Sequence, residues 1–408
     1  MEDTDKKSYL KDVEGIVSQC DRCGNCLTVC PLFGSKDIES SSARGKNNIA
    51  RGMLQGVVKP SVEVLKIINF CLLCGTCVAN CPSKVKTNDA MIALRQYFAD
   101  KNGSPGAKYK ALGILMKNRK LVKLSAVTFM VLRKSGMNKI IPNGMVPKEF
   151  TRKQYLTSFA GPAALGSFVP TSPIEFSNKS KVAYFKGCGM SMMFPDAVEG
   201  TLAILRTLTE PQLIDNMCCG LPHLAHGLRA DFLEMAKTNI SLFADADVIV
   251  SDCASCGGTL KHMATYFADD PVWKERATAF SGKIMGLSEY LVHVGYQPQQ
   301  RVDATLTFHE PCHLGRGQGI KKQPRQLLKA SGNFIEMTGS DTCCGGAGSF
   351  HMDYPDIAQS ILDKKRLNIE NSGAHIVVSE CPTCLVQLNK AATQSGGKFK
   401  VMHISQVI

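Results

Sequence analysis

Two long stretches of the chain repeat the same alternation of apolar and helix-forming segments. Each begins with a short apolar run, continues through a helical stretch and then reaches a β-branched segment. These segments are 182–185, 232–244 and 248–250 in the first stretch and 306–308, 357–371 and 376–378 in the second. Short apolar runs that alternate with helical stretches are typical of βα units with parallel strands. The pattern predicts two copies of an α/β domain, over residues 181–300 and 301–408.

The first 100 residues are expected to form a separate α-helical domain, because helix-favouring sequence such as Ala90 to Ala99 surrounds the cysteines there. Residues 101–180 then connect this domain to the first copy. They end in a stretch rich in Gly, Pro and Ser, at 161–173, which is typical of a linker. The chain of 408 residues is long enough for several domains. We therefore predict an α+β multi-domain protein.

The positive charge of the chain is concentrated in one segment, which the apolar pattern alone does not distinguish. The net charge of the chain is +13, and residues 101–153 hold thirteen Lys or Arg against the single acid Glu149. Apolar residues such as Leu112, Leu115 and Leu124 recur in this segment at helical spacing, which gives a basic amphipathic pattern.

Three interpretations of this basic segment stay open. It forms a solvated helix packed on its own protein, or it lies on an anionic membrane surface, where each Lys or Arg contributes about 1 kcal/mol. Nucleic acid is the third, but aromatic residues are sparse, with only Tyr109 and Phe129 in the basic core. We predict no nucleic-acid partner. The longest apolar stretch nearby, 127–132, is far shorter than the roughly 20 residues of a membrane-spanning helix.

All 18 cysteines fall into four ordered groups. Disulfides do not suit this arrangement, because two of the groups hold five cysteines each and include adjacent pairs. The N-terminal sequence MEDTDKKSYL also has no apolar signal region. We therefore expect a reducing, cytoplasmic location, with peripheral association at the inner face of the cytoplasmic membrane if the basic segment binds lipid.

The first two groups are C-x2-C-x2-C-x3-C-P runs. The first run is Cys20, Cys23, Cys26 and Cys30, and the second run is Cys71, Cys74, Cys77 and Cys81. This is the ligand pattern of bacterial ferredoxins, in which the fourth cysteine of each run serves the other cluster. The rule assigns Cys20, Cys23, Cys26 and Cys81 to one [4Fe-4S] cubane and Cys71, Cys74, Cys77 and Cys30 to the other. Forty residues separate Cys30 from Cys71, which favours the α-helical ferredoxin-like domain of respiratory dehydrogenases.

The other two groups are five-cysteine sets. The first set is Cys188, Cys218, Cys219, Cys253 and Cys256, and the second set is Cys312, Cys343, Cys344, Cys381 and Cys384. Five thiolates exceed the four iron corners of a cubane. Either one cysteine of each set is free, or a larger non-cubane [4Fe-4S] cluster uses all five. A zinc site built from the CxxC pair and two more thiolates is the alternative. We expect one or two iron–sulfur clusters here, at the carboxyl ends of the predicted strands, where α/β proteins bind ligands.

The pattern of C, then CCG, then CxxC, present twice, resembles the cysteine-rich CCG domain of a known family. Its members include the catalytic subunits of heterodisulfide reductase, one subunit of anaerobic glycerol-3-phosphate dehydrogenase, and the iron–sulfur subunits of glycolate oxidase and D-lactate dehydrogenase. The order of a ferredoxin part followed by two CCG domains fits the whole chain. Segments 43–45, 185–189 (FKGCG) and 343–350 (CCGGAGSF) resemble the iron–sulfur subunit of glycolate oxidase. All ten cysteines of the two sets are kept, as in heterodisulfide reductase.

The resemblance implies an iron–sulfur electron-transfer subunit of a multi-subunit, flavin-dependent dehydrogenase that oxidises a 2-hydroxy acid such as glycolate or lactate. Hydride chemistry would then take place on an FAD-containing partner subunit, because no flavin or nicotinamide site is visible in this sequence. Electrons would pass to a quinone or another carrier at the membrane. Resemblance to heterodisulfide reductase implies the alternative, a catalytic subunit that cleaves a disulfide at a CCG-bound cluster. A metal-dependent scaffold is a third hypothesis.

Five polar residues near the sets are weaker candidates. They are His223, His226, His309, Glu310 and His313. Such residues act as extra ligands, as donors to cluster sulfur or as proton carriers. Packed polar groups and helix caps are the more common explanation.

Overall fold

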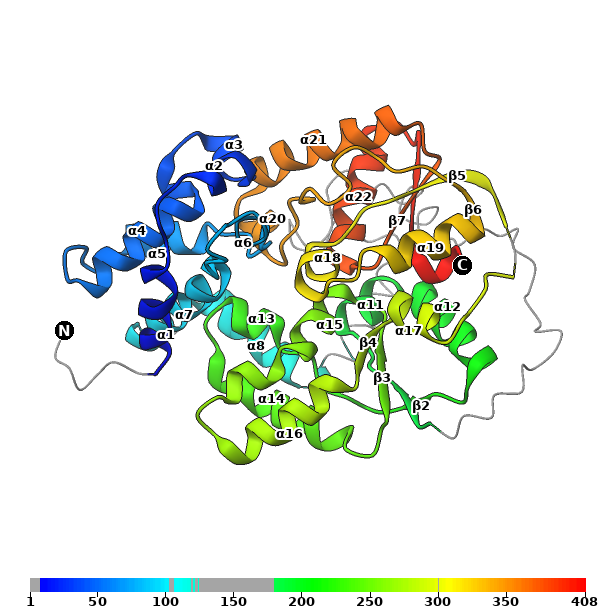
Figure 1. The fold of residues 1–408 in the computed structure, drawn as a ribbon, viewed down its shortest axis with the longest axis horizontal. Coiled ribbons are helices and arrows are strands. Elements are labelled where there is room, and N and C mark those ends of the chain that lie inside the picture. The colour runs from blue at the N-terminus through cyan, green and yellow to red at the C-terminus, as the bar shows by residue number, and fades with distance from the viewer. Residues whose placement is uncertain (1–7, 103–105, 119, 122–123, 125–179, 300) are drawn as a thin grey trace.

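The computed structural model of the chain describes residues 8–102, 106–118, 120–121, 124, 180–299 and 301–408. Figure 1 shows three parts. A helical domain in blue and cyan lies on one side, a first repeat in green forms the lower part of the view, and a second repeat in yellow to red forms the upper part. The described residues 8–102 are called the helical domain, residues 180–299 the first repeat and residues 301–408 the second repeat.

The helical domain consists of short helices packed around one apolar core. Its helices are α1 (Ser8–Ser18), α2 (Asn25–Val29), α3 (Phe33–Lys36), η2 (Glu39–Ser41), α4 (Ala43–Leu54), α5 (Val62–Asn69), α6 (Thr76–Ala79) and α7 (Thr87–Lys101). Side chains from α1, α4, α5 and α7 form the core, among them Val13, Ala50, Ile68 and Leu94. The segment Ala90 to Ala99, expected to be helical, lies within α7.

The first repeat is a parallel four-stranded sheet with helices between its strands. Its elements are β1 (Val182–Tyr184), α11 (Cys188–Met193), α12 (Pro195–Leu208), β2 (Gln212–Leu213), α13 (Leu221–Ala225), α14 (Arg229–Leu242), β3 (Val248–Ser251), α15 (Ala254–Lys261), η4 (Met263–Phe267), α16 (Pro271–Gly282), β4 (Ile284–Gly286) and α17 (Leu287–His293). The strand order is β2-β1-β3-β4.

The second repeat has the same architecture. Its elements are β5 (Val302–Phe308), α18 (Cys312–Gln318), α19 (Lys322–Ser331), β6 (Gly332–Phe334), α20 (Phe350–Asp353), α21 (Pro355–Ser372), β7 (Ile376–Ser379), α22 (Pro382–Gln394), β8 (Lys400–His403) and η5 (Ile404–Gln406). The strands are again parallel, in the order β6-β5-β7-β8. The two orders match position for position, so the predicted fold class, a helical part followed by two α/β copies, is confirmed.

The two repeats share one core rather than forming separate bodies. Buried apolar residues of both sheets belong to a single cluster, which includes Phe185, Val250, Phe308 and Val378. Backbone contacts cross between the repeats beside the CxxC pairs, since the Ala254 N–H donates to the Glu380 carbonyl at 2.7 Å. This shared core fixes the two strand-end regions against each other.

The helical domain is attached to the repeats by an apolar contact and by one buried arginine. Leu32 and Leu72 pack against Phe350, Ala358 and Ile361 of the second repeat. Arg95 of α7 is 7% exposed. Its guanidinium donates to the carbonyls of residues 68, 69 and 71 in its own domain and of residue 225 in the first repeat, at 2.8 to 3.2 Å.

The described part of the basic segment packs on the protein itself. Helix α8 (Ala107–Lys117) lies against the first repeat. Lys117 Nζ is 2.9 Å from Asp231 Oδ1 and 2.5 Å from Glu234 Oε2, and the Tyr109 ring stacks on His226 with centroids 3.8 Å apart. The predicted linker at 161–173 and the apolar stretch 127–132 lie outside the described residues. Within the described residues, no helix is long and apolar enough to span a membrane.

Replacing Arg95 by Met is predicted to weaken the attachment of the helical domain. The substitution keeps an unbranched apolar stem but leaves buried carbonyls without a donor, so we expect the free energy of unfolding to fall by on the order of 3 kcal/mol. The measurement is chemical unfolding of the holoprotein followed by circular dichroism. Arg206→Met, on an exposed position of α12, is the matched control. Equal unfolding midpoints for the two variants would contradict this role of Arg95.

Candidate functional site

Four strands deliver cysteines to the same edge of the two sheets. Cys188 is the first residue of α11 and Cys312 the first of α18, and each follows the first strand of its repeat. Cys253 and Cys381 are the N-cap residues of α15 and α22, directly after β3 and β7. The carboxyl ends of parallel strands meet at one crevice, which is the ligand-binding edge of α/β sheets.

The CCG segments approach this crevice through tight turns that only glycine permits. Gly220 has φ +86°, and a Cβ there would lie 2.4 Å from Cδ2 of Phe232. Gly345 has φ +81°, and a Cβ there would lie 2.7 Å from the carbonyl oxygen of Ala358. Both positions combine a left-handed backbone with no space for a side chain. The glycine of each CCG triplet therefore sets the direction of the two cysteines before it.

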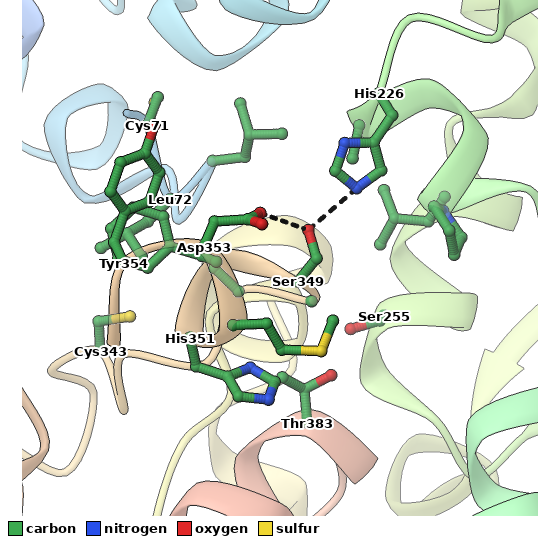
Figure 2. A pocket seen from close by; sticks show the side chains of 18 of the residues that line it. Cys71, Leu72, His226, Ser255, Cys343, Ser349, His351, Asp353, Tyr354 and Thr383 are labelled. Atoms are coloured by element: carbon green, nitrogen blue, oxygen red, sulfur yellow. Dashed lines mark hydrogen bonds between the residues drawn. The ribbon is translucent and has the colours of Figure 1, made fainter. Parts of the chain in front are cut away.

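A large cavity, the central cavity, lies where the three parts of the molecule meet. Its volume is about 1120 Å³, and its lining is mostly apolar. The cysteines that line it come from the second run and from both five-cysteine sets: Cys71, Cys188, Cys219, Cys253, Cys256, Cys312, Cys343, Cys344, Cys381 and Cys384. Figure 2 shows Cys71 and Cys343 on the walls of this pocket. Three of the four predicted groups thus border one space.

The second run surrounds a further small cavity of about 30 Å³. Cys30 of the first run lines it together with Cys71, Cys74 and Cys77. This is the grouping that the ferredoxin spacing predicts for one cubane. Lys46 also lines it and is 2% exposed, with its ammonium group donating to the Ser41 carbonyl. Cys71 borders both cavities, so it links the helical domain to the central cavity.

The first run lies toward the surface of the helical domain. Cys23 is exposed, and Cys20, Cys26 and Cys81 are half-buried. Ser83 donates to Asp21 at 2.5 Å, which ties the segment after Cys81 to the loop between Cys20 and Cys23. Burial raises the pKa of the Cys26 thiol, and the nearby thiol of Cys20 adds to that rise, whereas the backbone N–H of Arg44 lowers it.

Within each five-cysteine set, sulfur atoms lie in contact. Cys188 Sγ is 3.4 Å from Cys218 Sγ, and Cys344 Sγ is 3.4 Å from Cys384 Sγ. All 18 cysteines lie in described residues, and all are free thiols. Close groups of unpaired, buried sulfur atoms are soft ligands of the kind that bind iron–sulfur clusters or zinc.

The electrostatics of these thiols favour a bound cation. Burial raises the pKa of the Cys312 thiol, and the neighbouring thiols of Cys74 and Cys381 raise it further. The pKa of Cys77 is raised in the same way, first by burial and then by Cys74 and Cys71. Several thiolates are therefore stable in this interior only with positive charge beside them, which a metal centre supplies.

A buried lysine supplies part of that positive charge in the second repeat. Lys365 of α21 is 1% exposed, and its ammonium group donates to the carbonyls of Gly339 and Ser340 at 2.6 and 3.2 Å. Burial lowers its pKa to about 8, while the thiols of Cys344 and Cys343 oppose that shift. The interaction of the ammonium with the thiols of the second five-cysteine set is therefore favourable when these thiols are ionised.

One wall of the central cavity carries a polar network (Figure 2). Ser349 donates to Asp353 Oδ2 at 3.2 Å and lies 3.0 Å from His226 Nε2. Lys108 and Tyr109 of α8 both donate to Asp353, at 2.7 and 2.5 Å. Burial lowers the pKa of His226 to about 4, with the Arg95 guanidinium acting in the same direction, so this imidazole is neutral at pH 7.

The five polar candidates of the sequence separate into two kinds. His223 Nε2 lies 3.0 Å from the Gly113 carbonyl, and His313 Nδ1 lies 3.2 Å from Ser255 Oγ. Glu310 accepts from Arg325 at 2.8 Å, and His226 belongs to the network above. His309 differs, because neither of its ring nitrogens has a hydrogen-bond partner among the described residues.

Sequence reasoning missed the buried cations. Lys46, Arg95 and Lys365 stand in helices whose sequence gives no sign that these positions face inward. Lys46 lies in α4 four residues after Ser42, which caps that helix by accepting from the Gly45 N–H at 3.0 Å.

Family comparison gives two matches that together cover the cysteine groups. A 4Fe-4S dicluster domain matches residues 16–85. A cysteine-rich domain, CCG, matches twice, at residues 182–261 and 306–389. The second family therefore recognises the same duplication that the structure shows.

Curated relatives match the chain over different shares of its length. The chain is 29% identical to a probable glycolate oxidase iron-sulfur subunit of Bacillus subtilis, over 97% of this chain and 94% of the relative. It is 31% identical to lactate utilization protein A of an Exiguobacterium species, over 56% of this chain and 96% of the relative. It is 25% identical to a subunit of the fumarate reductase (CoM/CoB) of Methanothermobacter marburgensis, over 95% of this chain and 71% of the relative.

These matches confirm the resemblance that the cysteine spacing indicates. The chain therefore belongs to the family of iron–sulfur proteins that join a 4Fe-4S dicluster domain to two cysteine-rich CCG domains.

Proposed function

We propose that the chain is the iron–sulfur electron-transfer subunit of a multi-subunit, flavin-dependent dehydrogenase. The observation that carries this proposal is the shared central cavity. Cysteines of the second run and of both five-cysteine sets line it, and Cys71 also borders the small cavity of the helical domain. A continuous series of thiol groups from one domain to the other two is the arrangement that electron transfer needs.

The cysteines divide into four ligand groups in this proposal. Cys71, Cys74, Cys77 and Cys30 hold one [4Fe-4S] cubane, and the grouping around the small cavity supports this assignment. Cys20, Cys23, Cys26 and Cys81 hold the other by the ferredoxin rule. The two five-cysteine sets hold one or two further iron–sulfur clusters, for which the 3.4 Å sulfur contacts are the support. Bound there, these groups supply one-electron transfer.

The protein around the thiols keeps water out and offsets negative charge. Cys218, Cys219, Cys253 and Cys256 of the first set are buried, as are Cys344, Cys381 and Cys384 of the second. Lys46 stands beside the second run, and the thiols of Cys71 and Cys30 oppose the lowering of its pKa by burial. Burial, hydrogen bonding and nearby charge are the means by which a protein sets the reduction potential of a cluster.

The substrate of the complex is, in this proposal, a 2-hydroxy acid. Support comes from the relatives named for glycolate oxidase and for lactate utilization. Oxidation takes place on an FAD-containing dehydrogenase subunit, and the electrons pass to a quinone or another carrier. The mostly apolar lining of the central cavity suits a carrier of that kind.

A second candidate function is the cleavage of a disulfide at a cluster of the repeats. The observation that favours it is that both five-cysteine sets open to one cavity of about 1120 Å³, which has room for a small substrate between them. In that case the chain itself is the catalytic subunit.

The two functions are separated by reduction experiments on the anaerobically purified full chain. If the chain is an electron-transfer subunit, a co-purified flavoprotein that has been reduced with glycolate or lactate should bleach the visible iron–sulfur absorption within seconds. A low-molecular-weight dithiol and its disulfide should be neither oxidised nor reduced at a measurable rate. Stopped-flow absorption records both reactions.

A variant of the chain is the control for reduction of iron that is bound nonspecifically. Cys71→Ser removes the thiol that borders both cavities, and it should slow electron transfer into the repeats by at least tenfold. Catalytic turnover of the disulfide together with an inert flavoprotein would overturn the first function and support the second.

Peripheral attachment to the inner face of the cytoplasmic membrane is proposed for the basic segment beyond α8. The support is the charge of the segment 101–153, in which ten Lys or Arg lie outside α8. Cationic amphipathic segments bind anionic headgroups.

The membrane proposal predicts a loss of vesicle binding when the charge is removed. Substituting Gln for Arg119, Lys120 and Lys123 should weaken binding to phosphatidylglycerol vesicles by on the order of 100-fold, at about 1 kcal/mol for each charge. Gln at the exposed Lys321, Lys322 and Lys329 removes the same charge from the second repeat and is the control. Cosedimentation measures both, and equal binding of the two variants would refute the proposal.

A further inference from the structure

His309 is a buried histidine whose ring makes no hydrogen bond of good geometry within the described residues. It follows β5 and is 1% exposed, and its backbone N–H donates to the Val378 carbonyl at 2.9 Å. Among the described residues, the thiol of Cys344 is the group near enough to interact with the ring through a hydrogen bond. A buried polar group left without a partner costs about 1 to 3 kcal/mol, so such a group in a native interior calls for an explanation.

The ring stands beside two thiols of the second five-cysteine set. A ring nitrogen of His309, Cys344 Sγ and Cys384 Sγ all lie within 4.8 Å of one another. The two sulfur atoms are themselves 3.4 Å apart. His309 also lines the central cavity. The missing partner of the imidazole is therefore to be sought at the metal centre that these sulfurs would hold.

The imidazole of His309 has a ring N–H to donate whether it is neutral or protonated. Because the second set already offers five thiolates for iron, a further iron ligand is not needed there, whereas sulfur atoms of a cluster accept hydrogen bonds.

The first repeat has no such donor at the corresponding position. Phe185 occupies it, because its N–H donates to the Val250 carbonyl at 2.8 Å as the His309 N–H does to Val378. The Phe185 ring packs on Phe243, with centroids 5.7 Å apart. The two five-cysteine sets are thus alike in their thiols, and at this position the second repeat has an imidazole where the first has an apolar ring.

We propose that His309 donates its ring N–H to a sulfur atom of an iron–sulfur cluster held by the second five-cysteine set. Hydrogen bonds to cluster sulfur stabilise the reduced, more negative state and raise the reduction potential. A cluster held by the second repeat would therefore be easier to reduce with this hydrogen bond than without it. This inference rests on the iron–sulfur content proposed above for the second repeat.

The test is a redox titration of the anaerobically reconstituted full chain, followed by electron paramagnetic resonance. His309→Phe copies the first repeat and should shift the midpoint potential of one cluster signal to a more negative value. The other signals, and the iron and sulfide bound per chain, should stay unchanged. Cys384→Ser, which removes a thiol from the second set, identifies the signal that belongs to it.

Two further variants make the result specific. His309→Gln retains an N–H donor and should restore part of the potential. His375→Phe makes the same replacement at an exposed histidine of the same repeat and should shift nothing. If His309→Phe folds poorly, the midpoint potential of His309→Gln is compared with that of the wild-type chain, and a smaller shift to a more negative value is expected.

Two results would overturn the inference. An unshifted potential in His309→Phe with the cluster intact would show that the ring does not act on the cluster. Loss of one cluster's iron in both His309 variants would make the nitrogen an iron ligand instead of a donor. Zinc instead of iron in the second repeat of the wild-type chain is a distinguishable outcome, because it contradicts the proposed cluster content before any variant is compared.

Discussion

Thiolates that are buried away from water must be paired with positive charge, and this requirement governs how the cysteines of this chain are placed. Burial and neighbouring thiols raise the pKa of Cys77 and Cys312, so these groups stay protonated unless a cation binds. Lys46 and Lys365 bring ammonium groups to the second run and to the second five-cysteine set, at the expense of their own hydration. Metal binding supplies the larger part of the charge that is still needed.

The duplicated sheets bring the cysteines of the two repeats together in space. Parallel strands place four cysteines at their carboxyl ends, and in both repeats these cysteines line the same central cavity: Cys188, Cys253, Cys312 and Cys381. The helical domain completes the arrangement, because Arg95 fixes the backbone around Cys71 against the first repeat. Duplication also leaves room for divergence, as the pair Phe185 and His309 shows. One repeat packs an apolar ring where the other keeps a buried donor.

Much of this architecture could be predicted from the sequence. Apolar runs and β-branched segments locate the central strands, and the predicted helices 232–244 and 357–371 agree with α14 (Arg229–Leu242) and α21 (Pro355–Ser372) to within a few residues. Cysteine spacing indicates the family. The domain limits and the ligand assignments remain predictions.

What sequence reasoning could not provide depends on contacts between distant residues. Nothing near Arg95 indicates that its guanidinium reaches carbonyls in two domains, and nothing near Asp353 indicates that Lys108 and Tyr109 meet it across the chain. The sequence does not distinguish His309 from the four other polar candidates. Only the packing shows that it alone among the five has both ring nitrogens unpartnered within the described residues.

The most direct test of the central claim, that both runs of the helical domain and the five-cysteine sets hold iron, is anomalous X-ray scattering from crystals of the anaerobically purified chain. Data collected at the iron and zinc absorption edges place each metal independently of the protein atoms. The account predicts iron at both runs of the helical domain and at the five-cysteine sets beside the central cavity. Zinc at both five-cysteine sets, or no metal in either repeat, would contradict it.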